Sequence, residues 1–281
     1  SFVGLFLFIW RESTYKHPIV NLGVLKDGNL RIGILMSFIL GFGLYGSTLI
    51  IPIYTQAILG WTATDAGLLL IPGSITTAFM MPFIGKMIQK GVPQGYMVAA
   101  GFLVFFFFTF IMRNKMTPDT GTEHFYWALI LRGVGLGLLF VPITTLSLST
   151  LKGKQIGEGA AFTGMLRQLG GSFGIAIITT FITRFSQKHR VNLLSHYDGS
   201  RTEIQQRIIQ LQQGFQSKGF TPNEALQKAY QVMDFSITKQ STVMSYMDIF
   251  MYLGVLFLCC IPIVFLIKRG KNKVSLEEAM H

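Results

Sequence analysis

One apolar stretch constrains this chain more than any other feature: residues 125–150 read FYWALILRGVGLGLLFVPITTLSLST and contain a single charge, Arg132. At about 1.5 Å per residue, a helix of this length is roughly 39 Å long and crosses a hydrocarbon core of about 30 Å with some tilt. Arg132 would lie about 10 Å inside, where a cation costs at least about 2.5 kcal/mol unless it faces protein or water. Gly133 and Gly137 have GxxxG spacing, which lets a neighbouring helix approach closely. A costly charge beside closely packed glycines is typical of a helical bundle around a polar pathway, as in membrane transport proteins.

Further apolar stretches of spanning length make the expected fold class all-α and integral to a membrane, since a helix satisfies its own backbone polar groups in lipid. Half of the residues are hydrophobic and only 13% are charged, which supports this class. The predicted bundle covers residues 32–267, with spans at about 32–58, 64–87, 94–112, 125–150, 159–183 and 244–267. The first ten residues, SFVGLFLFIW, are too short to cross a bilayer, so we interpret residues 1–10 as the end of a truncated transmembrane helix.

Lys and Arg are unequally distributed between the two ends of the predicted spans. Twelve lie in the loop 11–31, the links after spans two and four, and the tail 268–281, whereas the two short opposite loops contain two. The positive-inside rule therefore predicts that the loop 11–31 and the C-terminal tail are cytoplasmic. The net charge of +11 does not indicate a nucleic-acid partner, because the basic residues lie mainly between apolar spans.

The long polar segment 184–243 is predicted to be extracytoplasmic and helical. Apolar residues recur there with the spacing of an amphipathic helix, at Ile204, Ile208, Leu211 and Phe215. Residues 221–224 resemble a capping box with proline at the first helical position, which predicts a second helix to about Ile237. We expect two short helices that lie over the outer mouth of the bundle.

Three residues near the ends of spans receive local interpretations. Asp65 and Asp248 are expected to cap the second and sixth spans, with a role in proton coupling as the alternative for either. His189 is expected to be a solvated loop residue. The five histidines are scattered and the two cysteines are adjacent within an apolar run, so no metal-ligand spacing is present in the sequence.

Several motifs together resemble the C-terminal six-helix repeat of a major facilitator superfamily transporter, and more narrowly the fourteen-helix drug:proton antiporters of the EmrB/QacA type. They are RGVGLGLLFVP in span four, RQLGGSFG in span five, YMDIF entering span six, and HPIVNLGVLKDGNLRIG leading into span one. The resemblance implies a location in a bacterial inner membrane. It also implies protons as the coupling ion, with no other cofactor. The implied partners are the lipid bilayer, the missing N-terminal half, a small-molecule substrate and a periplasmic adaptor protein.

The resemblance also places individual residues. Arg132, with Gly133 and Gly137, stands where the first half of such transporters has a membrane arginine followed by glycines, associated with proton transfer. Pro142 follows on the same span as a kink or a packing residue. Three glycines match the glycine-rich antiporter helix, although its usual proline is absent: Gly170, Gly171 and Gly174. The signature Gly-x-x-x-Asp-Arg of the cytoplasmic loop has a counterpart in which glutamine replaces the aspartate: Gly85, Gln89 and Lys90.

Each candidate pathway residue has an alternative interpretation. Arg132 either lines the pathway or is a structural arginine bonded to a neighbouring helix, and Arg167, beside Gln168, either faces the pathway or extends its charge to the membrane surface. Tyr54 and Gln56 are candidates for substrate contact near the outer mouth. Between their end turns the six spans contain no Asp or Glu. Because arginine stays protonated, we expect the proton carrier in the missing half.

The function that fits these observations is proton-coupled efflux of hydrophobic or amphipathic drugs. One alternative is a facilitator or importer of an anionic small solute, for which the two membrane arginines would be direct ligands. A non-transporting receptor or scaffold is a second alternative. An integral-membrane enzyme would need a cluster of His, Asp or Cys at a membrane face, and the sequence shows none, so no catalytic site is expected.

Overall fold

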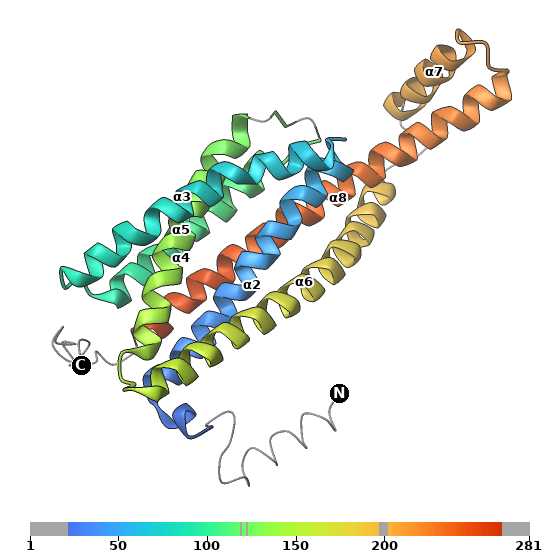
Figure 1. Cartoon of the computed structure of the whole chain (residues 1–281). Helices are drawn as coiled ribbons and strands as arrows, with labels where there is room; N and C mark the ends of the chain where they lie inside the picture. Colours follow the sequence, from blue (N-terminus) through green and yellow to red (C-terminus); the bar gives the residue numbers. More distant parts are fainter. Residues whose placement is uncertain (1–21, 119, 122, 197–201, 266–281) are drawn as a thin grey trace.

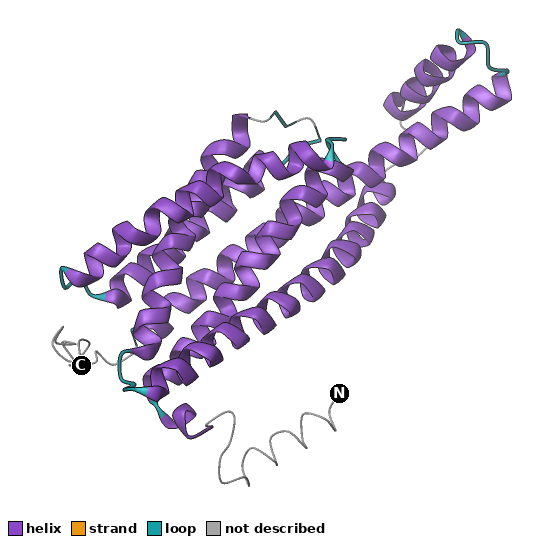
Figure 2. Ribbon diagram, in the orientation of Figure 1, coloured by secondary structure: helices purple, strands orange, loops and turns teal. Residues whose placement is uncertain are grey.

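The computed structural model describes residues 22–118, 120–121, 123–196 and 202–265. The predicted helix end 1–10, most of the loop 11–31 and the tail 268–281 lie outside these ranges. Within them every regular element is a helix and none is a strand (Figure 2). The elements are the 3-10 helix η1 (Leu22–Lys26) and the helices α2 (Gly28–Ala57), α3 (Ala63–Gln89), α4 (Gln94–Lys115), α5 (Glu123–Leu148), α6 (Lys154–His196), α7 (Thr202–Gln216) and α8 (Pro222–Val264).

Six of these helices are long and apolar enough to cross a membrane, namely α2, α3, α4, α5, α6 and α8. The chain is therefore a multi-pass membrane protein. Helix α2 packs most extensively against α6 and also contacts α5, whereas α5 packs against both α3 and α4, and α8 joins α4 to α6 (Figure 1). Helices α2 and α5 thus form the middle of the bundle. We call the end at which α2 and α4 finish and α3 and α5 begin the α7 end, because α7 lies beyond it.

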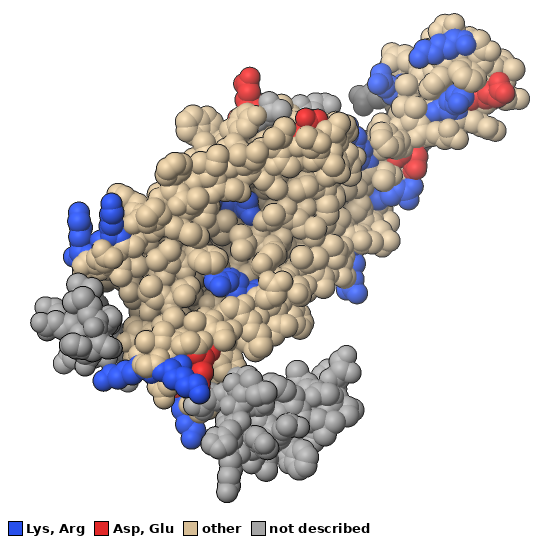
Figure 3. All heavy atoms as spheres, in the orientation of Figure 1, with Lys and Arg blue, Asp and Glu red and all other residues tan. Residues whose placement is uncertain are grey.

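Aromatic side chains form much of the core between α4 and α8. Phe105 and Phe108 are fully buried, and Phe257 of α8 lies 4.6 Å from the ring of Phe105 between centroids. Phe107, in the same run, is 49% exposed, so the run serves both as packing surface and as outer surface. Many large apolar side chains are exposed on the outside of the bundle. Most Lys and Arg lie towards its two ends, although two basic patches show midway along the face in Figure 3, and this distribution is expected for a surface that contacts lipid between two aqueous layers.

Helix α3 begins differently from the expectation. Its N-cap is Thr62, whose hydroxyl accepts from the backbone N–H of Asp65. The Asp65 carboxylate accepts in turn from the Thr62 hydroxyl at 2.7 Å. Asp65 is therefore the acidic residue of the first turn and not the cap, because the preceding threonine can satisfy the orphan backbone donor.

The segment 184–243 is helical, but its arrangement differs from the prediction of two short helices over the mouth. The amphipathic helix is present as α7, and the capping box at Thr221 and Glu224 opens α8. Helix α6 continues to His196, however, and α8 does not stop near Ile237 but runs into the sixth span. The reason is local: residues 184–196 and 223–253 contain neither Gly nor Pro.

The two continuous helices carry α7 away from the bundle. Helices α6 and α8 have 43 residues each, which is about 65 Å of helix and roughly twice a hydrocarbon core. Their surplus lengths project beyond the other spans, and α7 packs on the projecting part of α8 (Figure 1). We call the residues 187–196, 202–216 and 222–240 the helical projection.

Candidate functional site

Arg132 points from α5 into the bundle and is 5% exposed. Its Nε donates to the Ser47 hydroxyl at 3.2 Å, and its Nη2 donates to the Leu44 carbonyl at 3.4 Å and to the Thr48 hydroxyl. All three acceptors lie within two turns of α2. All three of these hydrogen bonds go to one neighbouring helix.

The acceptors of Arg132 are themselves held in place. The hydroxyls of Ser47 and Thr48 donate to the Leu44 carbonyl of their own helix, at 3.2 and 2.6 Å. Their oxygens therefore remain available as acceptors for Arg132. A buried cation that makes three such bonds to one neighbouring helix contributes to packing between helices. The geometry supports the structural interpretation of Arg132 rather than the pathway interpretation.

The glycines after Arg132 lie where α5 meets α3. A Cβ on Gly133 would overlap the Gly73 carbonyl of α3, and one on Gly137 would lie 2.7 Å from the Met80 Cβ. The Gly133 carbonyl also accepts from the Thr77 hydroxyl at 3.2 Å. The close approach of α3 and α5 therefore depends on the absence of side chains at Gly133 and Gly137.

Pro142 is buried within α5, which continues past it to Leu148. The hydroxyl of Thr145 donates to the carbonyls of Val141 and Pro142, at 2.9 and 3.2 Å. The carbonyl that Pro142 leaves without an amide donor is that of Leu138, four residues earlier, and these two bonds do not reach it. Pro142 is accommodated inside a continuous helix.

Arg167 differs from Arg132 in its partners. Its Cζ lies 4.2 Å from the centroid of the Phe140 ring of α5, so the guanidinium stacks on an aromatic face. Its Nη1 is shielded from solvent and has no hydrogen-bond partner among the described residues. The neighbouring Gln168 is exposed, and its Oε1 accepts from the Tyr45 hydroxyl of α2 at 3.0 Å. Arg167 is therefore a membrane cation with unused donors.

The glycines that follow Arg167 face α2. A Cβ on Gly170 would overlap the Phe38 carbonyl, one on Gly171 would overlap the Tyr45 ring, and one on Gly174 would lie 2.8 Å from the Phe42 carbonyl. Backbone therefore meets backbone along this contact, the most extensive between any two helices of the bundle. The two arginines are not brought together, since Phe140 lies eight residues, or about 12 Å of helix, beyond Arg132.

Tyr54 and Gln56, the candidates for substrate contact, lie in different surroundings. Tyr54 is fully buried at the α7 end, where its hydroxyl donates to the Thr117 carbonyl and its ring lies 5.8 Å from that of Tyr246. Tyr54 therefore closes the end of the core and does not face an open pathway in this structure. Gln56 is exposed on the last turn of α2.

The residues of the cytoplasmic signature end α3. A Cβ added to Gly85 would meet no atom within 4 Å, and Gln89 and Lys90 are exposed at the C-terminal end of the helix. Neither of the two ion pairs found among the described residues involves Lys90.

Asp248 and His189 form a pair that the sequence did not suggest. Asp248 is not a cap, because α8 is continuous through it, and its Oδ2 lies 2.7 Å from the Nε2 of His189 on α6. Further out, Arg190 donates to Asp234 at 2.5 Å. These contacts join the surplus lengths of α6 and α8 and hold the base of the helical projection together.

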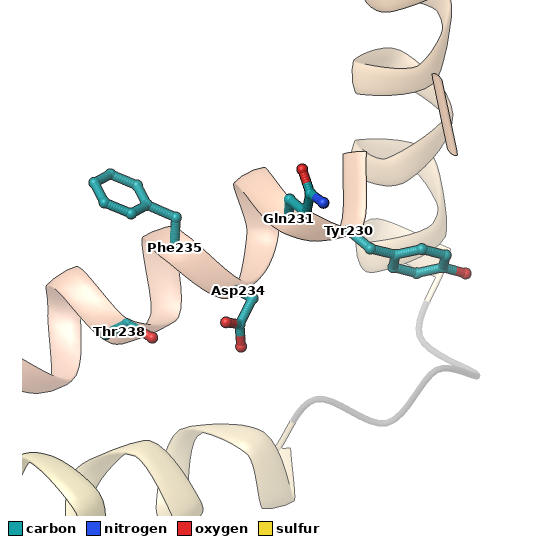
Figure 4. Close-up of a pocket in the computed structure, with 5 residues that line it drawn as sticks. All are labelled: Tyr230, Gln231, Asp234, Phe235 and Thr238. Carbon is teal, nitrogen blue, oxygen red and sulfur yellow. The ribbon is translucent and has the colours of Figure 1, made fainter. Parts of the chain in front are cut away.

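Two grooves occur at the α7 end. One, of about 470 Å³, is on the helical projection and is lined by Tyr230, Gln231, Asp234, Phe235 and Thr238 of α8. In Figure 4 the Phe235 and Asp234 side chains point to opposite sides of the helix, so no polar groups converge on a common point. The other, of about 270 Å³, is lined by Trp61, Asp65, Leu68, Leu69 and Tyr126. The described residues contain no group of three His, Cys, Asp or Glu that could hold a metal ion.

Sequence reasoning missed the partners of both arginines. Ser47 and Thr48 lie about ten residues, or 15 Å, before the end of span one, and Arg132 lies about 10 Å inside span four from the same end. This similarity of depth is a signal that could have paired them. No comparable signal connects Arg167 with Phe140, because phenylalanine is abundant throughout the chain.

Comparisons with known proteins agree with this architecture. The sequence model of the Major Facilitator Superfamily matches residues 1–175. The chain is 32% identical over 269 residues to the fatty acid resistance protein FarB of Neisseria gonorrhoeae, covering 95% of this chain and 51% of that protein. It is 27% identical over 263 residues to the multidrug export protein EmrB of Escherichia coli K12, covering 94% of this chain and 49% of EmrB.

A third relative is the lincomycin resistance protein LmrB of Listeria innocua, 29% identical over 181 residues that make up 64% of this chain and 38% of LmrB. The chain spans about half the length of the first two relatives. The similarity to FarB and EmrB extends over nearly all of the chain, including the segment beyond residue 175.

Proposed function

Because the chain belongs to the Major Facilitator Superfamily, we propose that it forms the C-terminal six-helix half of a proton-coupled exporter of hydrophobic or amphipathic drugs. The family and its relatives make the protein a membrane transporter and not an enzyme. Export of drugs is supported by two relatives whose names state multidrug export and lincomycin resistance. A third name states fatty acid resistance, which adds amphipathic acids to the substrate classes proposed here.

The observation that carries this proposal is an architecture of six spanning helices in a chain about half as long as its relatives. Transporters of this superfamily are built from two such six-helix repeats, with the substrate between them. The two least buried spans are α3 and α6. Both expose large apolar side chains, among them Leu68, Ile75, Phe79, Met165, Leu169 and Phe173. The missing half is the partner that would cover part of this surface, and the bilayer would cover the rest.

The proposed orientation follows from the charges. Basic residues at the end opposite α7 are assigned to the cytoplasmic side of a bacterial inner membrane, which leaves the helical projection on the outer side. The projection exposes Phe235 at 67% and Tyr230 at 55%. Exposed aromatic side chains are common in protein interfaces, and an adaptor protein on the outer side is the partner that this proposal assigns to them.

The proposal places the proton carrier in the missing half. Among the described residues, the spans carry acids only towards their ends, and Asp248 is paired with His189 at the level of Tyr54 near the α7 end. Arg132 stays protonated and is occupied by hydroxyls and a carbonyl. A midplane carboxylate from the other half would supply the group that takes and releases a proton.

Everted membrane vesicles containing the full-length transporter test this function. A fluorescent lipophilic dye should accumulate in them when respiration acidifies the interior, and a protonophore should abolish the accumulation. Vesicles from cells without the transporter provide the control for passive uptake. Accumulation that persists after the pH gradient is collapsed would refute proton coupling, and accumulation equal to the control would refute export.

A further inference from the structure

The two membrane arginines have different partners, and this difference identifies a binding site. The Nε and Nη2 of Arg132 donate to three acceptors on α2, whereas the Nη1 of Arg167 is shielded from solvent and no described residue accepts a hydrogen bond from it. We propose that Arg167 binds the anionic head group of an amphipathic carboxylate, with Phe140 and Gln168 completing the site. This inference rests on the proposed export function and names a substrate class for it.

The position of Arg167 argues against a charge that merely reaches the membrane surface. Helix α6 begins at Lys154, so Arg167 lies about 20 Å along the helix from its first residue. Its side chain reaches Phe140 of α5, with Cζ 4.2 Å from the ring centroid. The half-buried Arg167 side chain is therefore held against a neighbouring span.

The stacking on Phe140 fixes how a ligand can approach. The Phe140 ring occupies the side of the guanidinium that faces α5, so a ligand has to approach from another side, where the fork of N–H donors can match the two oxygens of a carboxylate. The Nη1 atom is cut off from solvent without a hydrogen-bond partner among the described residues. An unsatisfied buried donor is unfavourable, and a shift of the side chain that brings Nη1 to an entering carboxylate would remove this penalty.

Open space and a second donor lie on the same side of α6. Gly164 is one turn before Arg167 and Gln168, and a Cβ built on it meets no atom within 4 Å. Gln168 accepts from the Tyr45 hydroxyl through its Oε1, which orients the amide and leaves its nitrogen as a donor without a described partner. Two neighbouring donors beside an open space are the elements of a small anion site.

The surroundings decide the kind of anion. No carboxylate of the described residues pairs with Arg167, so the part of the protein that the structure describes does not neutralise its charge. The spans around it are apolar, and a fully hydrophilic anion would lose its hydration without compensation on entering them. A carboxylate attached to a hydrocarbon chain brings the charge that Arg167 needs and an apolar part that the spans accommodate.

Binding to the full-length transporter in phosphatidylcholine nanodiscs tests the site, with empty nanodiscs to correct for partition into lipid. The probes are laurate, its methyl ester and dodecyltrimethylammonium. Laurate should bind more tightly than the ester to the wild type. Arg167→Gln should weaken laurate binding about ten- to a hundredfold, the range expected for a lost charged hydrogen-bond pair, and should leave ester binding unchanged.

Two further variants separate recognition from folding. Gly164→Leu keeps the charge but fills the open space, so it should weaken laurate binding without touching Arg167. Arg184→Gln makes the same charge change on an exposed residue of α6 and should alter neither ligand. If Arg167→Gln does not fold, Gly164→Leu decides the question.

Several results would overturn the proposal. The first is equal binding of laurate and its ester to the wild type. The second is unchanged laurate binding in the folded Arg167→Gln or Gly164→Leu variant. The third is an equal loss of binding of all three probes in Arg167→Gln. Competition by phosphatidylglycerol without binding of laurate would assign the site to a lipid phosphate instead. Arg167-dependent binding of laurate in a protein that exports no dye would refute the proposed export while the site stands.

Discussion

Replacement of Arg132 by methionine or by lysine tests how the bundle is held together. For a charge in water, lysine would be the milder replacement, because it keeps the charge. For the buried Arg132 we expect lysine to lower the free energy of unfolding more than methionine does. Arg132→Met removes three hydrogen bonds to Ser47, Thr48 and Leu44. At about 0.6 kcal/mol for each bond between helices in a membrane, this loss is about 2 kcal/mol, but the substitution also removes a burial cost of at least about 2.5 kcal/mol. The free energy of unfolding should therefore change by less than about 1 kcal/mol.

Arg132→Lys should be the more damaging replacement. Lysine retains the buried charge and its cost, but a single ammonium cannot replace the fork that reaches acceptors on two turns of α2. Losing two of the three bonds, at about 0.6 to 1.7 kcal/mol each, predicts a destabilisation of about 1–3 kcal/mol.

The unfolding free energy of the full-length transporter, titrated with SDS in mixed micelles, measures both effects. Arg184→Lys and Arg184→Met are the matched controls, since Arg184 is exposed on α6 and surface replacements usually change stability by less than about 0.5 kcal/mol. A lysine variant as stable as the wild type, together with a methionine variant destabilised by more than about 3 kcal/mol, would refute the reasoning. That ranking would mean that the positive charge at position 132, and not the geometry of its hydrogen bonds, stabilises the bundle.

Three further predictions concern other contacts. Gly137→Leu should lower the unfolding free energy by about 1–3 kcal/mol through overpacking against α3, which SDS titration measures, and an unchanged value would place Gly137 at a lipid-facing surface. His189→Ala should release the pair with Asp248 and increase hydrogen exchange at the base of the helical projection, while exchange in the middle of α6 stays unchanged; equal protection in both proteins would contradict a clamping role. Hydrogen bonds from Thr221 lower the pKa of Glu224 below its ordinary value of 4.5. The ionised carboxylate therefore stabilises the start of α8 fully above pH 4.5, and this stabilisation is lost as the pH falls through the lowered pKa. Hydrogen exchange of the Glu224 amide, corrected for its intrinsic pH dependence, should follow this loss in the wild type but not in Thr221→Ala, and identical profiles would contradict the assignment.

Features with a local cause can be predicted from the sequence. The apolar runs predict the spanning helices because length and hydropathy suffice to make a helix the favoured structure in lipid. The capping box at Thr221 and Glu224 is predictable because its two hydrogen bonds join residues three positions apart. The absence of Gly and Pro from residues 184–196 favours a continuous α6, whereas the polar composition of the same residues favours a helix separate from the span. The structure shows that backbone propensity prevails.

Contacts between distant residues cannot be predicted in the same way. Asp248 is a plausible cap because acids are common at helix starts, whereas its partner His189 lies 59 residues away on another helix. Tyr54 is a candidate for substrate contact because it is an aromatic residue near the mouth, but packing of the neighbouring helices around it buries it completely.

For the two arginines, the sequence by itself determined their location in the membrane, and only the tertiary structure decided their partners. The sequence determined that both charges lie inside membrane spans and need compensation, because this follows from their positions in apolar runs and from the cost of burying a cation. Only the tertiary structure decided that Arg132 receives hydroxyls 84 and 85 residues away, while Arg167 receives an aromatic face and keeps unused donors. The physical reason is that burial energy depends on position along one helix, whereas the partner of a side chain depends on which helices pack together and in which rotation.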